Sequence, residues 1–235
     1  MMAQENFNLS CAICEIRKEK RFCPAVHGRI CPQCCGEQRE VTLDCPSDCP
    51  YLQQARQQAQ EHAAHDRADW SGHATLYSDI EIPKIEIPEQ FLYEREELIL
   101  GLSFALAKSS RADRQLMDRD LITALSSLAK SYATRVNSSL IYEQSTANLG
   151  HQAIAHEVET MVREFRAAEQ QHVGQTRLRD SDVLKALAFL LRMALARTSG
   201  RPKSRAFIDF LFAQFPEKHS ALADSQDAGS RIVIP

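Results

Sequence analysis

All eight cysteines of this 235-residue chain lie within its first fifty residues, at spacings typical of metal ligands. The segment contains one pattern twice: Cys-x2-Cys is followed by Cys-Pro and then, four residues after that last cysteine, by His or Cys. The two copies supply eight soft or borderline ligands, the number that two tetrahedral zinc ions require. The predicted ligands are Cys11, Cys14, Cys23, His27, Cys31, Cys34, Cys45 and Cys49.

The order of the pairs allows two ways of sharing these ligands between two ions. In a sequential arrangement, residues 11–27 bind one ion and residues 31–49 bind the other. In a cross-brace arrangement, the two Cys-x2-Cys pairs share one ion, and the remaining four ligands share the second. The spacing is compatible with both arrangements.

Cys35 is left over when the ligands are counted in this way. The favoured interpretation is a small buried residue beside the site. In a second interpretation Cys35 replaces His27 as a ligand. In a third it is a reactive thiol, which requires an exposed thiolate of low pKa.

Zinc is the metal that the spacing favours. An iron–sulfur cluster is disfavoured because two equal quartets differ from the common ferredoxin spacings. Disulfides and thiol-redox chemistry are disfavoured because Cys-x2-Cys pairs in a reducing compartment more often bind metal.

Residues 31–49 resemble a treble-clef zinc finger, with a Cys31–Cys34 knuckle, a short strand expected at 41–43, and ligands at the start of a helix opening at Pro50. The alternation of ligand pairs also resembles the cross-brace fingers of the RING, MYND and FYVE types. The whole layout loosely resembles uncharacterised bacterial proteins with a CPxCCG…CPxxCxYL segment. The first two resemblances imply the type of ligand, and the third implies no activity.

The elements that must position these ligands form a mainly α protein. Residues 1–50 contain too few apolar side chains for a core, so we expect metal to hold this zinc-binding module together. Residues 51–89 predict a connecting helix and then an extended strap, "IEIPKIEIP", in which Pro83 and Pro88 exclude a central strand.

Residues 90–216 predict an α-helical bundle of about five helices. Apolar residues recur every three or four positions near 91–107, 114–136 and 151–172, in a segment opening at Asp180, and at 203–215. The polar residues 217–235 are expected to form a flexible tail.

Two basic clusters are candidate contacts for an anion or a nucleic acid: the turn 17–21 and the loop 192–205. The formal net charge is −3, so no global basic field favours such a partner. The acidic segment 79–97 could pair with the second cluster internally, and we favour that interpretation. The candidate contacts are Arg17, Lys18, Lys20, Arg21, Arg197, Arg201, Lys203 and Arg205.

These observations favour a non-enzymatic, zinc-binding protein-interaction module or adaptor. The chain contains no nucleotide-binding fingerprint, no HExxH and no GxSxG, so neither catalysis nor a small-molecule substrate is indicated. Its N-terminus does not read as a secretory signal and its longest apolar run, 186–191, is short, so we expect a cytoplasmic protein outside membranes. Nucleic-acid binding through the two basic clusters is one alternative. An iron–sulfur or thiol-redox protein is another.

Overall fold

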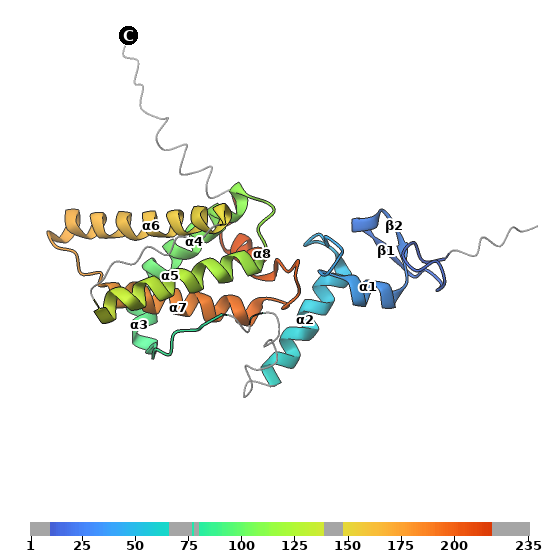
Figure 1. Cartoon of the computed structure of the whole chain (residues 1–235), viewed down its shortest axis with the longest axis horizontal. Coiled ribbons are helices and arrows are strands. Elements are labelled where there is room, and N and C mark those ends of the chain that lie inside the picture. Colours follow the sequence, from blue (N-terminus) through green and yellow to red (C-terminus); the bar gives the residue numbers. More distant parts are fainter. Residues whose placement is uncertain (1–9, 66–76, 78–79, 139–147, 218–235) are drawn as a thin grey trace, which may run out of the picture. The chain divides into compact units, whose positions relative to one another are not determined.

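The computed structural model describes residues 10–65, 77, 80–138 and 148–217 of a mainly helical protein (Figure 1). The chain divides into two compact units. Unit 1 contains Met1–Ser78 together with Arg197–Ala206, and unit 2 contains Asp79–Ala196 and Phe207–Pro235. The loop 197–206 therefore belongs to the same unit as the cysteines, although it lies within the range that we predicted to be bundle. All but the first residue of the predicted tail 217–235 lies outside the described residues.

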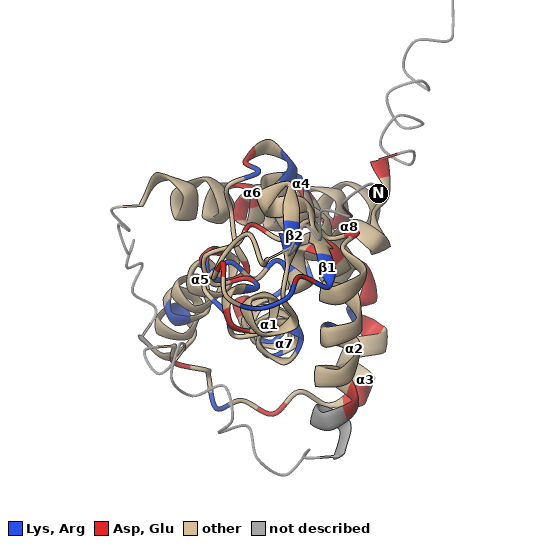
Figure 2. Ribbon diagram, turned by 90° about the vertical axis from the view of Figure 1, so that its right-hand side faces the viewer, with Lys and Arg blue, Asp and Glu red and all other residues tan. Residues whose placement is uncertain are grey.

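In its described residues, unit 1 contains two short strands and two helices. Strands β1 (Arg21–Cys23) and β2 (Gly28–Ile30) form an antiparallel hairpin around a 3-10 turn (Pro24–Val26), with Phe22 opposite Arg29. Lysine and arginine occur along this part of the chain (Figure 2). Helix α1 (Pro32–Gln38) follows the hairpin directly, and α2 (Pro50–His65) begins at Pro50.

The strand expected at 41–43 does not form. The backbone N–H groups of Val41, Thr42 and Leu43 all point back to the carbonyl of Gln38, so they are not available for a strand ladder. Only an isolated bridge between Arg39 and Leu43 remains. The residues after α1 are therefore a tight turn.

Unit 2 contains the remaining six helices of the described chain. They are α3 (Glu89–Glu94), α4 (Glu96–Ala112), α5 (Asp118–Ser138), α6 (Leu149–Val173), α7 (Asp180–Arg197) and α8 (Ala206–Gln214). The prediction of about five helices was wrong by one in this region, because the first predicted helix is broken. The break lies at Arg95, where φ is −120° and ψ is 24°.

The core of unit 2 forms around α7. The consecutive residues Ala186, Leu187 and Ala188 are all fully buried, so this helix is covered on several sides. Helix α6 packs against both α4 and α5. A Cβ on Gly101 of α4 would lie 3.2 Å from Sδ of Met161, so the missing side chain permits the close approach of α4 and α6.

Two polar contacts tie other segments of unit 2 to this core. The buried carboxylate of Asp118 accepts the backbone N–H groups of Phe207 and Ile208 at 3.1–3.2 Å, and so satisfies donors in the first turn of α8. Residues 80–88 form neither helix nor strand. Nη2 of Arg192 donates to the carbonyls of Pro83 (3.1 Å) and Ile85 (2.7 Å), which holds this extended strap against the helices.

Candidate metal centre

Four cysteine sulfurs come together in unit 1. The Sγ atoms of Cys11, Cys14, Cys31 and Cys34 all lie within 4.8 Å of one another. Three of these residues are buried and Cys14 is half-buried. The quartet joins the two Cys-x2-Cys pairs, which is the pairing of the cross-brace arrangement and not of the sequential one.

The first pair is held in a tight backbone turn. The N–H of Glu15 donates to the carbonyl of Cys11 at 2.8 Å, and the N–H of Cys11 donates to the carbonyl of Arg17 at 2.8 Å. Glu15 takes up the reversal in the left-handed region, with φ of 55°. This turn brings the thiols of Cys11 and Cys14 to the same side of the chain.

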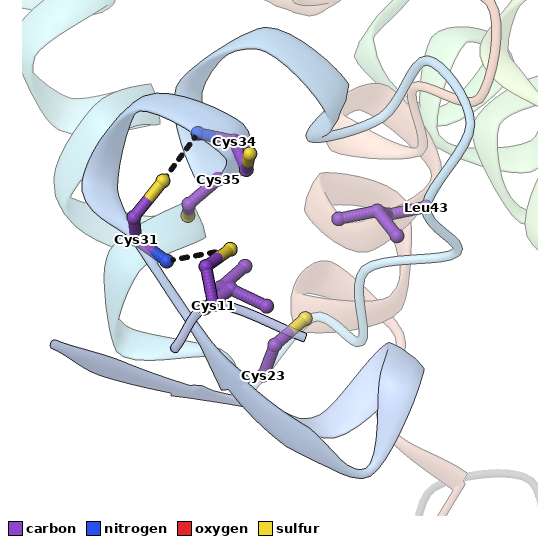
Figure 3. Close-up of a cluster of buried hydrophobic side chains, with 7 residues drawn as sticks. Cys11, Cys23, Cys31, Cys34, Cys35 and Leu43 are labelled. Carbon is purple, nitrogen blue, oxygen red and sulfur yellow. Dashed lines mark hydrogen bonds between the residues drawn. The ribbon is translucent and has the colours of Figure 1, made fainter. Parts of the chain in front are cut away.

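The second pair lies at the start of α1. Cys31 is the N-cap residue and its Sγ accepts the N–H of Cys34 at 3.4 Å, as a capping side chain does. The N–H of Cys31 donates in turn to Sγ of Cys11 at 3.2 Å, which links the two pairs (Figure 3). Pro32 occupies the first helical position, where a missing N–H is tolerated.

These backbone donors set the ionisation of the thiols. Burial raises the pKa of Cys11, but N–H donors from Cys14, Cys31 and Ile13 outweigh it and lower that pKa to about 6. The backbone N–H of Cys34 lowers the pKa of Cys31 against the effect of burial. Burial and the neighbouring thiols raise the pKa of Cys34 to about 12. The site therefore stabilises negative sulfur at some positions and requires additional positive charge before all four can ionise.

Arg17 supplies part of that positive charge from outside. Its Nη1 lies 3.8 Å from Sγ of both Cys31 and Cys34. The contact with Cys31 is the largest cause that raises the pKa of the guanidinium, and the same contact lowers the pKa of the Cys31 thiol. A single arginine offsets only one of four thiolate charges, whereas a divalent ion offsets two and bonds directly to all four sulfurs.

The donor set fits a structural metal ion. Four thiolates complete the tetrahedral coordination that zinc prefers, which leaves no position for a water or a substrate. Iron also accepts four thiolates. The quartet is a candidate structural centre, held together by local backbone geometry.

The other four predicted ligands lie nearby but less tightly grouped. Cys23 ends β1, and Cys45 and Cys49 lie in the turn before α2. Burial raises the pKa of Cys45, and a hydrogen bond from the backbone of Glu40 lowers it. The charges of Cys23 and Cys49 raise this pKa further, so both lie close enough to interact with Cys45. His27 is exposed and has a left-handed φ of 49°. In the described part of the chain, no second group of three or more His, Cys, Asp or Glu residues is placed to hold a metal ion.

Cys35 lies outside the quartet. It is only 8% exposed, and Nη1 of Arg21 lies 3.7 Å from its Sγ. The Arg21 guanidinium also stacks over the ring of Tyr51, with 4.5 Å between its central carbon and the ring centroid. This environment agrees with the interpretation of Cys35 as a small buried residue.

Two basic residues of the second cluster have partners within unit 1. Nη1 of Arg201 donates to the carbonyls of Gly36 (2.9 Å) and Arg39 (2.5 Å). Nζ of Lys203 contacts the carbonyl of Thr42 and the carboxylate of Asp44, both at 2.9 Å. The predicted internal counter-charge was the acidic segment 79–97, but these two side chains contact residues 36–44.

The remaining candidate anion contacts differ in exposure. Burial lowers the pKa of Arg197, and Arg205 is half-buried with contacts inside the protein. Lys18 and Lys20 are exposed. Arg17 and Arg21 face thiols, as described above.

Sequence reasoning missed Glu40, a buried carboxylate in the turn after α1. Glu40 is 2% exposed and has a left-handed φ of 53°. Its Oε1 accepts a hydrogen bond from Nη2 of Arg56 in α2 at 2.7 Å. Its backbone carbonyl accepts one from the N–H of Lys203 at 2.8 Å. Glu40 thus joins the turn after α1 to α2 and to the loop 197–206. No sequence signal distinguished it from other charged residues.

Comparisons with protein-family models, curated proteins and solved structures gave no match for this chain. The function must therefore be inferred from the geometry of the site. Within the described residues, none of the helices combines the length and the apolar character needed to span a membrane.

Proposed function

We propose that this chain is a non-enzymatic zinc-binding protein that acts as a protein-interaction adaptor, with zinc in a purely structural role. The observation that carries the proposal is the buried quartet of Cys11, Cys14, Cys31 and Cys34. Four protein ligands leave zinc no open coordination position, and catalytic zinc sites require one.

We further propose a second zinc ion, bound by Cys23, His27, Cys45 and Cys49. The charges of Cys23 and Cys49 raise the pKa of Cys45, and this proximity to Cys45 supports a second site. His27 follows Cys23 by four residues in a left-handed conformation, which histidine adopts more readily than most residues. The two ions would then form a cross-brace.

The order of elements around the quartet supports a treble-clef-like arrangement. A Cys-x2-Cys turn is followed by the β1–β2 hairpin, and the hairpin by a helix whose first turn carries the second pair. Residues 11–38 therefore fit the treble-clef order better than residues 31–49, for which the sequence suggested it.

Exposed apolar side chains on unit 2 support an adaptor role. Leu149, Tyr93 and Leu100 are 80%, 73% and 43% exposed. Aromatic residues such as Tyr93 are enriched in the interfaces that proteins form with one another. Photocrosslinking from positions 93 and 149 in the cells that produce the protein should give discrete protein adducts. Position 86, which is exposed and polar, serves as the control, and equal labelling from all three positions would contradict the adaptor role.

Metal analysis of the anaerobically purified chain tests the metal proposal. We expect two zinc ions per chain and no visible absorption, since an iron–sulfur cluster would colour the sample. Cys34→Ser and Cys45→Ser should each lose one ion while the bundle helices persist in circular dichroism. Cys35→Ser is the matched control and should retain both. Loss of an ion from Cys35→Ser but not from His27→Asn would assign Cys35 as the ligand.

A further inference from the structure

The β1–β2 hairpin has an outward face that the metal centre does not use. This face continues into residues 18–20, which lead into β1. Exposure alternates along residues 18–23: Lys18, Lys20 and Phe22 are exposed, whereas the residues between them are half-buried and Cys23 is buried. This period of two is that of an extended strand with one face covered. The inner face carries ligands and core, so the outer face is free to contact another molecule.

This outer face combines a flat aromatic ring with positive charge. Phe22 is 56% exposed. Arg29 lies directly opposite it in the antiparallel register, and opposed residues share one face of a sheet. Nε of Arg29 contacts Oε1 of Glu19 at 2.7 Å, yet 54% of the arginine side chain remains exposed. Lysine and arginine are visible along both strands in Figure 2.

We propose that this hairpin face binds single-stranded nucleic acid, with Phe22 stacking on a base and Lys18, Lys20 and Arg29 contacting phosphates. Proteins that bind single strands without sequence preference commonly place cations along the path of the nucleic-acid backbone and aromatic rings against the bases. Residues two apart on a strand are separated by about 6.8 Å, close to the distance between consecutive phosphates of an extended single strand.

The same face fits an acidic peptide less well. Its cations would attract carboxylates, but an aliphatic side chain gains most of its binding free energy by filling a recess. A base presents a planar surface that covers an exposed phenyl ring without any recess. The aromatic residue therefore favours the nucleic acid.

The charge of unit 1 opposes this partner less than the charge of residues 1–50 alone suggests. Thiolates would oppose a polyanion, but Arg17 and Arg21 lie against thiols on the inner side, and bound zinc would offset two of the quartet's four negative charges. The loop 197–206 adds four basic residues and no acidic residue to the unit. The outward cations thus act in an environment less acidic than residues 1–50 alone would provide.

Fluorescence anisotropy of the zinc-loaded full chain with a fluorescein-labelled dT12 strand tests the proposal. Three phosphate contacts predict a salt slope near −2, so affinity should fall about 20-fold between 50 and 200 mM salt. Phe22→Ala should weaken binding about fivefold or more, because one base stack is lost. Val136→Ala, which trims another exposed apolar side chain, should have no effect.

The double variant Lys18→Gln/Lys20→Gln should bring the salt slope to about −0.7, whereas Lys84→Gln should leave it unchanged. Each variant must retain the zinc content of the parent chain, so that loss of binding reports the surface and not unfolding. No binding at 50 mM salt would overturn the proposal. Equal displacement of dT12 by poly-L-glutamate, with Phe22→Ala as competent as the parent chain, would assign the face to an acidic protein segment.

Discussion

Nη1 of Arg201 donates a 2.9 Å hydrogen bond to the backbone carbonyl of Gly36, a residue 165 positions earlier in the chain. The same nitrogen reaches the carbonyl of Arg39, so a cation lies at the C-terminal end of α1. The N-terminal end of α1 carries two thiols of the quartet. The helix that presents the second Cys-x2-Cys pair is therefore held at both ends, once by the site and once by the loop 197–206.

Arg201→Ala should weaken zinc retention although Arg201 is not a ligand. Two carbonyls at the end of α1 lose a charged donor, which predicts a loss of about 2 kcal/mol or more in the stability of unit 1. Zinc transfer to a chromogenic chelator should become faster, and amide exchange over residues 36–44 should increase. Arg177→Ala, an exposed arginine of unit 2, is the control. Unchanged transfer in Arg201→Ala would show that the loop does not support the site.

Arg17→Gln should raise the pH at which zinc is released on acidification. Backbone bonding and Arg17 together lower the pKa of Cys31. Because the thiol is an acid, its thiolate form is present above this pKa and is lost as the pH falls through it. Without Arg17 that pKa rises, and protons displace the ion at a higher pH.

A pH titration of bound zinc checks this expectation, with Lys20→Gln as an exposed control from the same turn. A midpoint that does not move in Arg17→Gln, or that moves equally in both variants, would contradict it.

Asp118→Ala should destabilise unit 2 strongly. The substitution leaves the backbone N–H groups of Phe207 and Ile208 buried without their acceptor, which predicts a loss of about 2–4 kcal/mol in the free energy of unfolding. Urea unfolding followed by circular dichroism measures it. Asp113→Ala removes an exposed carboxylate that accepts one backbone N–H and should lose about 1 kcal/mol or less. Equal losses would show that burial of the Asp118 contact is unimportant.

Arg192→Met should loosen the strap while preserving the helices. The methionine keeps the apolar stem but cannot donate to the carbonyls of Pro83 and Ile85. Hydrogen exchange and limited proteolysis at residues 80–88 should increase several-fold at unchanged helicity. Arg163→Met, on the surface of α6, is the control and should leave the strap protected. Unchanged protection in Arg192→Met would show that the isoleucines alone hold the strap.

The features that the sequence predicted correctly depend on neighbouring residues. Cys-x2-Cys pairs converge because a tight turn suffices, and apolar residues repeated every three or four positions mark a helix whatever it packs against. The helix starting at Pro50 was expected on the same local grounds. The cysteine cluster and the helical class could therefore be predicted before any tertiary contact was known.

The features that were missed depend on distant residues or on single backbone angles. The turn at 41–43 forms because three N–H groups converge on one carbonyl, which β-propensity at Val41 and Thr42 does not reveal. The break at Arg95 coincides with side-chain contacts to Glu169 and Asp182, both far away in sequence. The partners of Arg201 could not be predicted either, because no pattern links a loop arginine to carbonyls 162 and 165 positions away.

The participation of the loop 197–206 in unit 1 has a consequence for synthesis of the protein. The thiols leave the ribosome first, while Arg201 follows Gly36 by 165 residues, a delay of about 10–30 s at ordinary translation rates. During that interval the nascent cysteines are complete in number but lack the loop that secures α1. Metal can reach them before the loop does, so we expect early metal capture, and not the loop, to protect these thiols from oxidation on the growing chain.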